Sequence, residues 1–209
     1  MKILIVDDHA VFRRGIRETL GDAFPKVIFG EAKTAQEALT LISQQDWDVV
    51  ILDISMPGRS GLDILDDLQD LRKRLPILLL SMHPEEQYAR RALKSGAAGY
   101  LTKDCIPDEL KDAVRKVASG GRFVSASLAE KLAFDLRRGG ERPLHELLST
   151  REFQVLRMIA LGKTVKEIGD ELSLSVKTVS TYRARILEKS GMKTNADLIR
   201  YALQEQLVS

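Results

Sequence analysis

Three carboxylates stand at the ends of two apolar runs in this sequence. Asp7 and Asp8 follow residues 2–6, and Asp53 follows the β-branched run 49–52. A continuous apolar run of this length indicates a strand buried on both faces, as in a parallel sheet. The carboxyl ends of parallel strands meet at one edge, where ligands bind, so we expect the three acids to converge. An isolated aspartate after a strand is more often a turn or capping residue, and the rest of the chain decides between the two interpretations.

Carboxylates that share a crevice repel one another, which raises their pKa values unless a cation neutralises them. A hard ion such as Mg²⁺ fits better than zinc, because no cluster of His or Cys accompanies the acids. The adjacent His9 is interpreted as a capping or surface residue. Ser81 and Lys103 also end expected strands and add a hydroxyl and an ammonium to the same edge. Together these groups are what phosphoryl transfer to an aspartate requires.

Strands and helices alternate through the first half of the chain. Strands are expected at residues 2–6, 27–29, 49–53, 77–80 and 100–101. Helices are expected at 10–20, after the cap Thr34, at 62–71, 85–94 and 107–117. In the first helix Val11, Ile16 and Leu20 should share the buried side, and Gly21 should end it. The alternation predicts an α/β doubly wound five-stranded parallel sheet with helices on both faces.

The residues that carry this chemistry resemble the receiver domain of two-component response regulators over residues 2 to about 119. They are Asp7-Asp8, Asp53, Pro57-Gly58, Ser81, Tyr100 and Lys103, in that order and spacing. The resemblance implies a flavodoxin-like fold in which Asp53 is the phosphoacceptor. It also implies that Asp8 and Asp53 bind Mg²⁺ directly, together with the backbone carbonyl of Ser55, and that Asp7 assists through water.

The same resemblance implies that Lys103 contacts the acyl phosphate, that Ser81 shifts toward it and that Tyr100 turns inward as a switch. Two positions depart from the family pattern: Asp104 replaces a common proline, and Arg59 replaces a small or apolar residue. Neither carries the core chemistry.

An enzyme is the main alternative to a receiver. An aspartate-nucleophile phosphatase of the haloacid dehalogenase class needs a second acid two residues after the nucleophile, and that position is Ser55. We therefore predict no enzyme beyond a receiver that catalyses its own phosphorylation and dephosphorylation. A regulator that uses the receiver only as a protein-docking module, without phosphorylation, stays open.

The overall composition limits the possible cellular compartment and the possible binding partners. The 209 residues are 44% hydrophobic and 30% charged, which is ordinary for a globular protein. No apolar run approaches the length of a membrane span and no signal peptide precedes the first strand, so a cytoplasmic protein is expected. The single Cys105 excludes an internal disulfide and is interpreted as structural. Residues 1–119 carry a net charge of −2 and residues 120–209 a net charge of +4, which favours a second domain facing a polyanion.

The junction combines a helical pattern with a linker, and from Ser149 onward the pattern is entirely helical. Residues 125–138 have helical spacing, and residues 138–143 indicate a flexible linker. Helices are then expected from Ser149 to 161, at 166–172 and 176–190, with a last amphipathic helix at 196–207 that carries Ile199, Leu203 and Leu207. The short helix, turn and longer basic helix predict a helix-turn-helix motif whose second helix enters the major groove of DNA.

Helical geometry divides the 176–190 helix into two faces. Val179, Ile186 and Tyr182 lie toward the packing side, with Arg183 at its rim. The opposite face should meet DNA. The alternative is a charged helix face that contacts only solvent. Lys177 and Thr181 lie nearest the bases, and phosphates suit Arg183, Arg185 and Lys166. The predicted DNA-binding residues are Lys166, Lys177, Thr178, Ser180, Thr181, Arg183, Ala184 and Arg185.

The motif residues of the second half resemble the four-helix LuxR-type DNA-binding domain over residues 146–208. They are Ser149-Thr150-Arg151-Glu152, Lys166-Glu167-Ile168, Leu172, Ser175 to Val179 and Gly191. A receiver joined to this domain is similar to the NarL/FixJ class of response regulators. The expected domains are a receiver at 1–119, a linker with a helix at 120–145 and the DNA-binding domain at 146–209.

Membership of this class implies a mechanism and a set of partners. A cognate sensor histidine kinase would phosphorylate Asp53, and phosphorylation would promote a homodimer, paired through the last helix, on double-stranded promoter DNA. RNA polymerase is a further candidate partner, and no membrane is expected. The alternative for the last helix is that its apolar stripe faces only its own core.

Overall fold

The computed structural model describes residues 1–82, 85–130 and 143–208. The chain divides into two compact units, Met1–Arg138 and Gly139–Ser209. The domain limits expected from the sequence stay a prediction. No helix in the part of the chain that the structure describes is long and apolar enough to cross a membrane.

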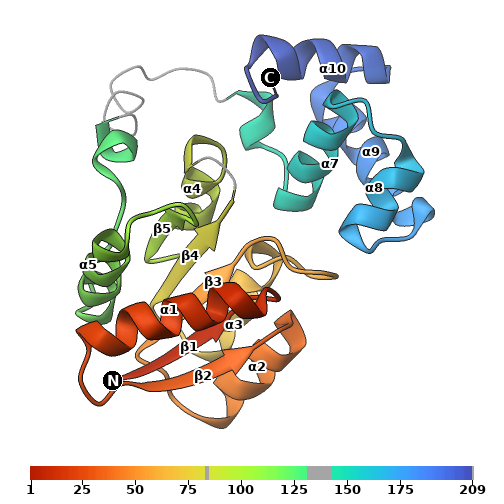
Figure 1. Ribbon diagram of the computed structural model, residues 1–209. Helices are drawn as coiled ribbons and strands as arrows, with labels where there is room; N and C mark the ends of the chain where they lie inside the picture. Colours follow the sequence, from red (N-terminus) through yellow and green to blue (C-terminus); the bar gives the residue numbers. More distant parts are fainter. Residues whose placement is uncertain (83–84, 131–142, 209) are drawn as a thin grey trace. The chain divides into compact units, whose positions relative to one another are not determined.

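The first unit is built on a parallel sheet with the strand order β2-β1-β3-β4-β5 (Figure 1). The strands are β1 (Lys2–Val6), β2 (Ile28–Ala32), β3 (Val49–Asp53), β4 (Ile77–Ser81) and β5 (Gly99–Thr102). The residues of β3 and β4 are all buried, as the continuous apolar runs predict for strands covered on both faces. The order runs outward from β1 in both directions, which confirms the predicted doubly wound sheet.

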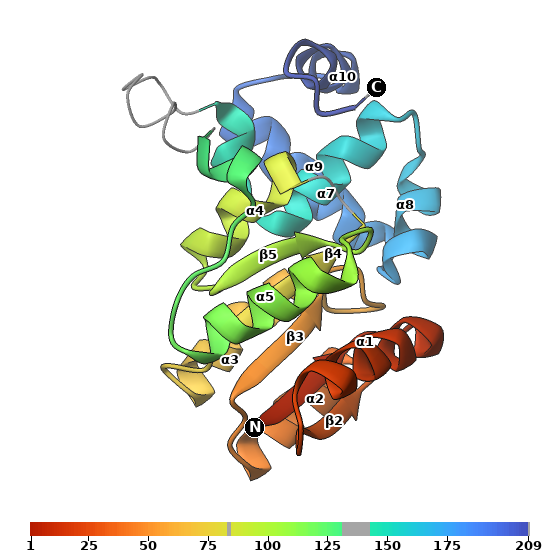
Figure 2. The same cartoon turned by 60° about the vertical axis from the view of Figure 1, so that its left-hand side comes forward.

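Helices cover both faces of this sheet (Figure 2). They are α1 (Ala10–Ala23), α2 (Ala35–Gln44), a short 3₁₀ turn η1 (Leu62–Ile64) that leads into α3 (Leu65–Leu71), α4 (Glu85–Lys94) and α5 (Pro107–Ala118). The faces of α1 and α5 that carry Ile16, Leu20 and Val114 pack on Ile5 and Ile51 of the central strands. This arrangement leaves the carboxyl ends of β1 and β3 at one open edge.

Three sequence-based expectations about the first unit were wrong in detail. The first helix continues past Gly21 to Ala23, because Gly21 keeps helical backbone and the turn comes only at Phe24. Val11 is 87% exposed, since five helical residues separate it from the buried Ile16 by about 140° around the axis. The second strand begins at Ile28 and runs to Ala32, three residues beyond its expected end, because β1 pairs with it over its whole length.

The chain that leaves α5 returns along the sheet. Phe123 forms a parallel bridge with Gly99 of β5, and residues 126–130 are helical. The remainder of the helix expected at 125–138, and residues 138–142 of the expected linker, lie outside the described residues.

The second unit is helical throughout its described part. Its elements are η2 (Leu144–Glu146), α7 (Thr150–Ala160), α8 (Val165–Leu172), α9 (Val176–Ser190) and α10 (Asn195–Gln204). Helices α8 and α9, joined by a three-residue turn, form the predicted helix-turn-helix motif. Gly169 makes the tight turn possible, because a Cβ there would lie 2.8 Å from the carbonyl oxygen of Leu174.

The last helix is shorter than expected and presents a different face to its core. It ends at Gln204, and Leu198 and Ala202 are its fully buried side chains. Leu207 is buried beyond the end of the helix, whereas Leu203 is 55% exposed. The apolar stripe is therefore shared between the core of this unit and an exposed surface.

Candidate functional site

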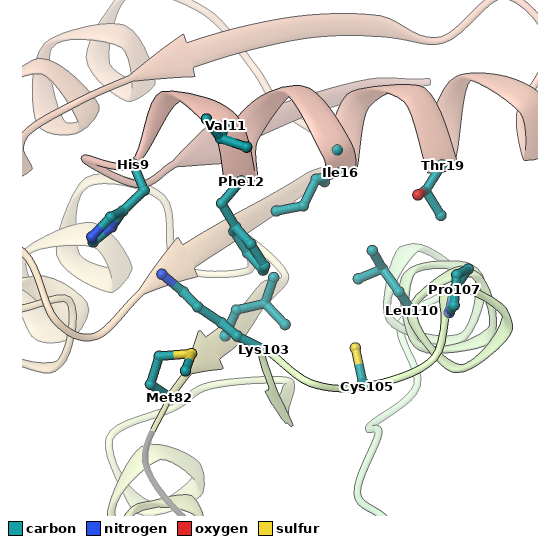
Figure 3. Close-up of a pocket in the computed structure, with 12 residues that line it drawn as sticks. His9, Val11, Phe12, Ile16, Thr19, Met82, Lys103, Cys105, Pro107 and Leu110 are labelled. Carbon is teal, nitrogen blue, oxygen red and sulfur yellow. The ribbon is translucent and has the colours of Figure 1, made fainter.

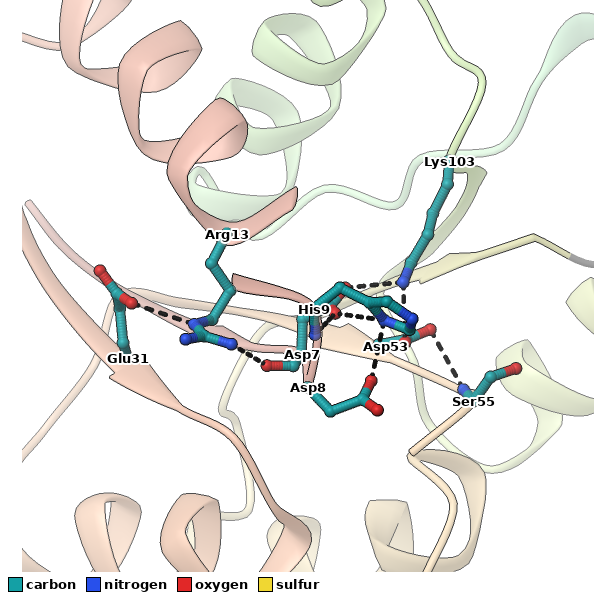
Figure 4. A network of polar contacts seen from close by, with 8 residues as sticks. All are labelled: Asp7, Asp8, His9, Arg13, Glu31, Asp53, Ser55 and Lys103. Carbon is teal, nitrogen blue, oxygen red and sulfur yellow. Dashed lines mark hydrogen bonds and ion pairs between the residues drawn. The ribbon is translucent and has the colours of Figure 1, made fainter. Parts of the chain in front are cut away.

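The three acids expected to converge do so at the carboxyl edge of the sheet (Figure 4). Strands β1 and β3 are neighbours, so Asp7, which follows β1, lies beside Asp53, the last residue of β3. One side-chain ligand atom from each of Asp7, Asp8, His9 and Asp53 lies within 4.8 Å of the others. Asp7 and Asp53 are almost completely buried, while Asp8 is partly exposed and opens the cluster to solvent.

Lys103 lies between the two buried carboxylates. Its Nζ is 2.7 Å from Asp7 Oδ2 and 2.8 Å from Asp53 Oδ2, and its side chain is 5% exposed. Burial alone would lower the pKa of Lys103, but the hydrogen bonds to Asp53 and Asp7 outweigh burial and raise that pKa above its usual value. Burial raises the pKa of Asp53, and the hydrogen bond from Lys103 opposes this rise.

The remaining charge of the cluster suits a divalent cation. Three carboxylates face one ammonium, so two negative charges are left when His9 is neutral. The donors are mainly carboxylate oxygens, which is the donor set that Mg²⁺ prefers. The backbone N–H of Ser55 donates to Asp53 Oδ1 at 3.1 Å, which fixes the chain that follows β3 against the same carboxylate. These residues fit a magnesium ion.

His9 was expected at a cap or on the surface, and it occupies both places. It is the N-cap residue of α1 and its side chain is 65% exposed. Its imidazole Nδ1 nevertheless lies 3.1 Å from Asp7 Oδ1 and 2.9 Å from Asp8 Oδ1. In the sequence, the signal for these contacts is the position of His9 directly after two acids.

Ser81 and Tyr100 form a second polar pair beneath this edge. Both side chains are fully buried, Ser81 as the last residue of β4 and Tyr100 within β5. Burial raises the pKa of the Tyr100 phenol, and a hydrogen bond with Ser81 opposes the rise. Ser81 follows Leu80, which lies beside Asp53 in the register of β3 and β4, so Ser81 lies at the edge of the sheet where Asp53 ends.

A buried guanidinium that the sequence did not single out supports the loop of acids. Arg13 of α1 is 5% exposed and donates from Nη1 to the backbone oxygen of Asp7 at 2.6 Å (Figure 4). Its Nε donates to Glu31 Oε2 of β2 at 3.0 Å, and this bond is the main reason that the pKa of Glu31 is lowered. Arg13 thus supplies a partner for a buried carbonyl immediately after β1.

An apolar groove of about 540 Å³ opens beside the acidic cluster, between α1 and α5 (Figure 3). Phe12, Ile16 and Leu110 line it, and Lys103 closes one end with its Nζ 4.7 Å from the centre of the Phe12 ring. Cys105 also lines the groove, and burial raises the pKa of its thiol to about 11. The thiol is therefore protonated at neutral pH, in agreement with a structural role.

The side chains of α9 divide into a buried face and an exposed face. Val179 and Ile186 are fully buried, as the helical phase predicts. The exposed members of the predicted set are Lys177, Ser180, Thr181, Ala184 and Arg185 on α9, and Lys166 on α8.

Three members of the set have hydrogen-bond partners within the second unit, and one of these bonds is the one that Thr181 Oγ1 donates to the Lys177 carbonyl oxygen at 3.0 Å. The backbone N–H of Thr178 donates to Ser175 Oγ in the N-terminal cap of α9. Arg183 is half-buried, and its Nε donates to Asn195 Oδ1 of α10 at 2.6 Å. Arg183 thus joins α9 to the start of α10.

A buried acid anchors α9 to the helix that precedes the motif. Glu152 of α7 is 2% exposed, and its Oε2 accepts from Lys189 Nζ of α9 at 2.6 Å. The same oxygen accepts from the Ser149 N–H at 2.7 Å and completes a capping box at the start of α7. Helix α9, with its exposed face, is therefore fixed both by the buried side chains of this unit and by the ion pair between Lys189 and Glu152.

Comparisons with known proteins cover both units. The model of the response regulator receiver domain matches residues 3–115, and the model of the bacterial regulatory proteins of the luxR family matches residues 146–202. Response regulator UvrY of Escherichia coli K12 is 34% identical over 209 residues, which are 99% of this chain and 95% of UvrY. Response regulator GacA of Pseudomonas aeruginosa is also 34% identical and is covered to 98%.

A solved structure also matches nearly the whole chain. RcsB of Salmonella enterica serovar Typhimurium, bound to the promoter rprA in the presence of the phosphomimetic BeF₃⁻, is 27% identical with a TM-score of 0.63. The match covers 96% of this chain and 97% of that one.

Proposed function

The chain belongs to the two-component response regulators that carry a LuxR-type DNA-binding domain, a class of DNA-binding transcription regulators, and on this premise we propose that Asp53 is its phosphoacceptor. The observation that supports this most directly is the position of Asp53. It is a buried carboxylate at a strand end, beside Lys103 and within reach of two further acids. Asp53 is the last residue of β3. This strand lies between β1, which the loop of acids follows, and β4, which ends at Ser81.

In the proposed reaction a carboxylate oxygen of Asp53 attacks the phosphorus of a phosphohistidine on a sensor histidine kinase. The P–N bond breaks, a P–O bond forms and the histidine leaves with the electron pair. Lys103, already 2.8 Å from Asp53 Oδ2, neutralises the charge on the phosphoryl oxygens. Asp8, Asp53 and the backbone carbonyl of Ser55, with Asp7 assisting through water, would hold Mg²⁺, which would supply further charge neutralisation.

Hydrolysis of the acyl phosphate by water returns the carboxylate. The receiver in this proposal therefore acts catalytically only on its own aspartate. Ser81 and Tyr100 are the proposed switch, because the phosphoryl group on Asp53 would sit beside the Ser81 hydroxyl and Tyr100 is bonded to that hydroxyl.

The second unit is proposed to bind double-stranded promoter DNA as a dimer, which is the behaviour typical of this class after phosphorylation. Lys177 and Thr181 point to the base edges in this proposal. Lys166 and Arg185 face phosphates, which position the protein without reading sequence. Leu203, exposed on α10, is suited to the contact between two copies. A regulator that acts on promoters would work in the cytoplasm, and RNA polymerase is proposed as a further partner.

The test of the phosphoacceptor compares the wild type with Asp53→Asn in acetyl phosphate and Mg²⁺. Intact-mass spectrometry should find one phosphoryl group on the wild type and none on the variant, and light scattering should report a dimer only for the phosphorylated wild type. Circular dichroism serves as the control that Asp53→Asn is folded. A phosphorylated Asp53→Asn protein would refute the assignment. DNA binding that is equal in both proteins would favour a receiver used only for docking.

The test of the DNA face uses Lys177→Ala against Lys111→Ala, which removes the same charge from α5 of the other unit. At matched salt, Lys177→Ala should weaken DNA binding and reduce the salt dependence, while Lys111→Ala should leave both unchanged. Equal affinities in the two variants would remove Lys177 from the interface.

A further inference from the structure

The chain that leaves α5 is fastened to the edge of the sheet. Residues 122–125, the exit strap, run parallel to β5 (Figure 2). The Phe123 N–H donates to the Ala98 carbonyl at 2.9 Å, and the Tyr100 N–H donates to the Phe123 carbonyl at 3.4 Å. Gly99 permits this approach, because a Cβ there would lie 2.8 Å from the Phe123 oxygen. Since the strap runs parallel to β5, it carries the chain back toward the edge where Asp53 lies.

The strap ends on a carboxylate of α4. The Ser125 N–H donates to Glu85 Oε1 at 3.3 Å, and the Ser125 hydroxyl donates to Glu85 Oε2. The same hydroxyl accepts from the Leu128 N–H at 3.1 Å, so Ser125 also caps the helical residues 126–130. Glu85 is the first residue of α4. One carboxylate therefore holds both the end of the strap and the start of the next helix.

The exit strap also contacts the proposed switch, because the Tyr100 N–H donates to the Phe123 carbonyl oxygen at 3.4 Å. The charge of Glu85 contributes to the raised pKa of the Tyr100 phenol, after the larger effect of burial. Tyr100 in turn shares a hydrogen bond with Ser81, which ends the strand beside Asp53. Polar groups thus follow one another from the phosphoacceptor edge to the segment that leads toward the second unit.

We propose that the Glu85–Ser125 pair is a latch, here the exit latch, through which the state of Asp53 controls the segment that leads to the DNA-binding unit. The proposal rests on the proposed function of Asp53. A phosphoryl group beside Ser81 changes the partner of the Tyr100 hydroxyl. A displaced Tyr100 shifts the exit strap, to which its backbone N–H is hydrogen-bonded, and so disturbs the contact between Ser125 and the Glu85 carboxylate. The strap and the cap of residues 126–130 share this carboxylate, so both shift together.

The exit latch is tested in the full chain by two substitutions, Glu85→Gln and Ser125→Ala. Glu85→Gln keeps the shape and removes the charge, and Ser125→Ala removes the hydroxyl. The matched controls are Glu109→Gln on α5 and Ser119→Ala at its C-cap, which make the same chemical changes away from the latch. The quantity measured is the ratio of DNA affinities with and without acetyl phosphate and Mg²⁺, with intact mass as the check that Asp53 is phosphorylated.

Both latch variants should take the phosphoryl group as the wild type does. Their affinity ratio should fall by roughly five- to tenfold, the size of a modest coupling between two sites, while the controls keep the wild-type ratio. The double variant should lose no more than either single variant, because both act on one contact.

Two results would overturn the latch, and they differ in what they imply. Latch variants that keep the wild-type ratio, in a wild type that responds to phosphorylation, refute the latch and leave Asp53 as phosphoacceptor. A wild type that takes no phosphoryl group refutes the proposed function and removes the latch with it.

Discussion

Replacing Glu152 by Gln should destabilise the second unit and should do so only where the carboxylate is charged. Glu152 is almost fully buried, and its Oε2 accepts hydrogen bonds from the Ser149 N–H and from Lys189 Nζ. Glutamine has the same length but no charge. The substitution therefore removes the charged contact between α7 and α9 and weakens the capping box, while the packing of the side chain is kept.

The expected loss follows from the exposure of the partners. Lys189 is 42% exposed, so solvent screens the ion pair and its contribution is about 0.5–1 kcal/mol. The weakened cap adds about 0.5–1 kcal/mol. A total of about 1–2 kcal/mol corresponds to a decrease of roughly 5–15 °C in the melting temperature of a unit of this size.

The stability difference between the wild type and Glu152→Gln should depend on pH in a defined direction. Burial alone would raise the pKa of Glu152, but the bonds from Lys189 and Ser149 outweigh it and lower that pKa below the usual 4.5. A lowered pKa in the folded state means that the stabilisation is complete above the unfolded value and is lost as pH falls through the folded value. The difference between wild type and Glu152→Gln should therefore be full near neutral pH and should shrink below about pH 4.5.

Thermal unfolding followed by helical circular dichroism measures this difference at both pH values. Glu171→Gln in α8, whose partner Lys163 lies at the surface of the same unit, is the control and should change stability little. A loss that is equal at neutral and acid pH, or no loss at neutral pH, would refute the reasoning about charge.

Four further predictions concern the first unit. Gly61→Ala should cost about 1–3 kcal/mol in urea unfolding and slow phosphorylation by acetyl phosphate, because its Cβ would lie 2.1 Å from the Asp53 carbonyl oxygen. Gly15→Ala should instead stabilise by about 0.8–1 kcal/mol in the same assay, since no atom lies within 4 Å of the new methyl group and the site is an exposed helix interior. In Mg²⁺-free buffer Lys103→Met should cost about 3–5 kcal/mol by leaving two buried carboxylates unpaired, and added Mg²⁺ should restore part of the loss. Alkylation of Cys105 should be slow at neutral pH and should accelerate up to about pH 11, and rapid labelling at neutral pH would contradict the raised pKa.

The sequence alone was sufficient for the fold class and for the identity of the groups at the first site. Continuous apolar runs that end in Asp7 or Asp53 fix buried strands and place acids at their carboxyl ends, because the position of a residue within a strand is a local property. The helix starts were equally local. Thr34 accepts the backbone hydrogen bond that its predicted role as a cap requires. Ser149, expected to open its helix, caps that helix in the same way. Such features depend on residues three or four apart in the chain.

The contacts between distant segments could not be predicted in this way. Arg13 is one arginine among several on an amphipathic helix, and only the pairing of β1 with β2 brings Glu31 and the Asp7 carbonyl to it. The burial of the guanidinium is invisible in the periodicity, which marks Arg13 as a surface residue.

The exit strap makes the same point for residues that the sequence placed in a linker. Phe123 lies in no regular pattern and Ser125 only begins an expected helix, yet they pair with β5 and with Glu85, 40 residues away from Ser125 in the chain. The sequence by itself determined which elements form and which chemical groups stand at their ends, since these follow from short-range patterns of polarity and capping. Only the tertiary structure decided which of these groups meet, because the partners of a buried charge or an edge strand are selected by the packing of the whole sheet.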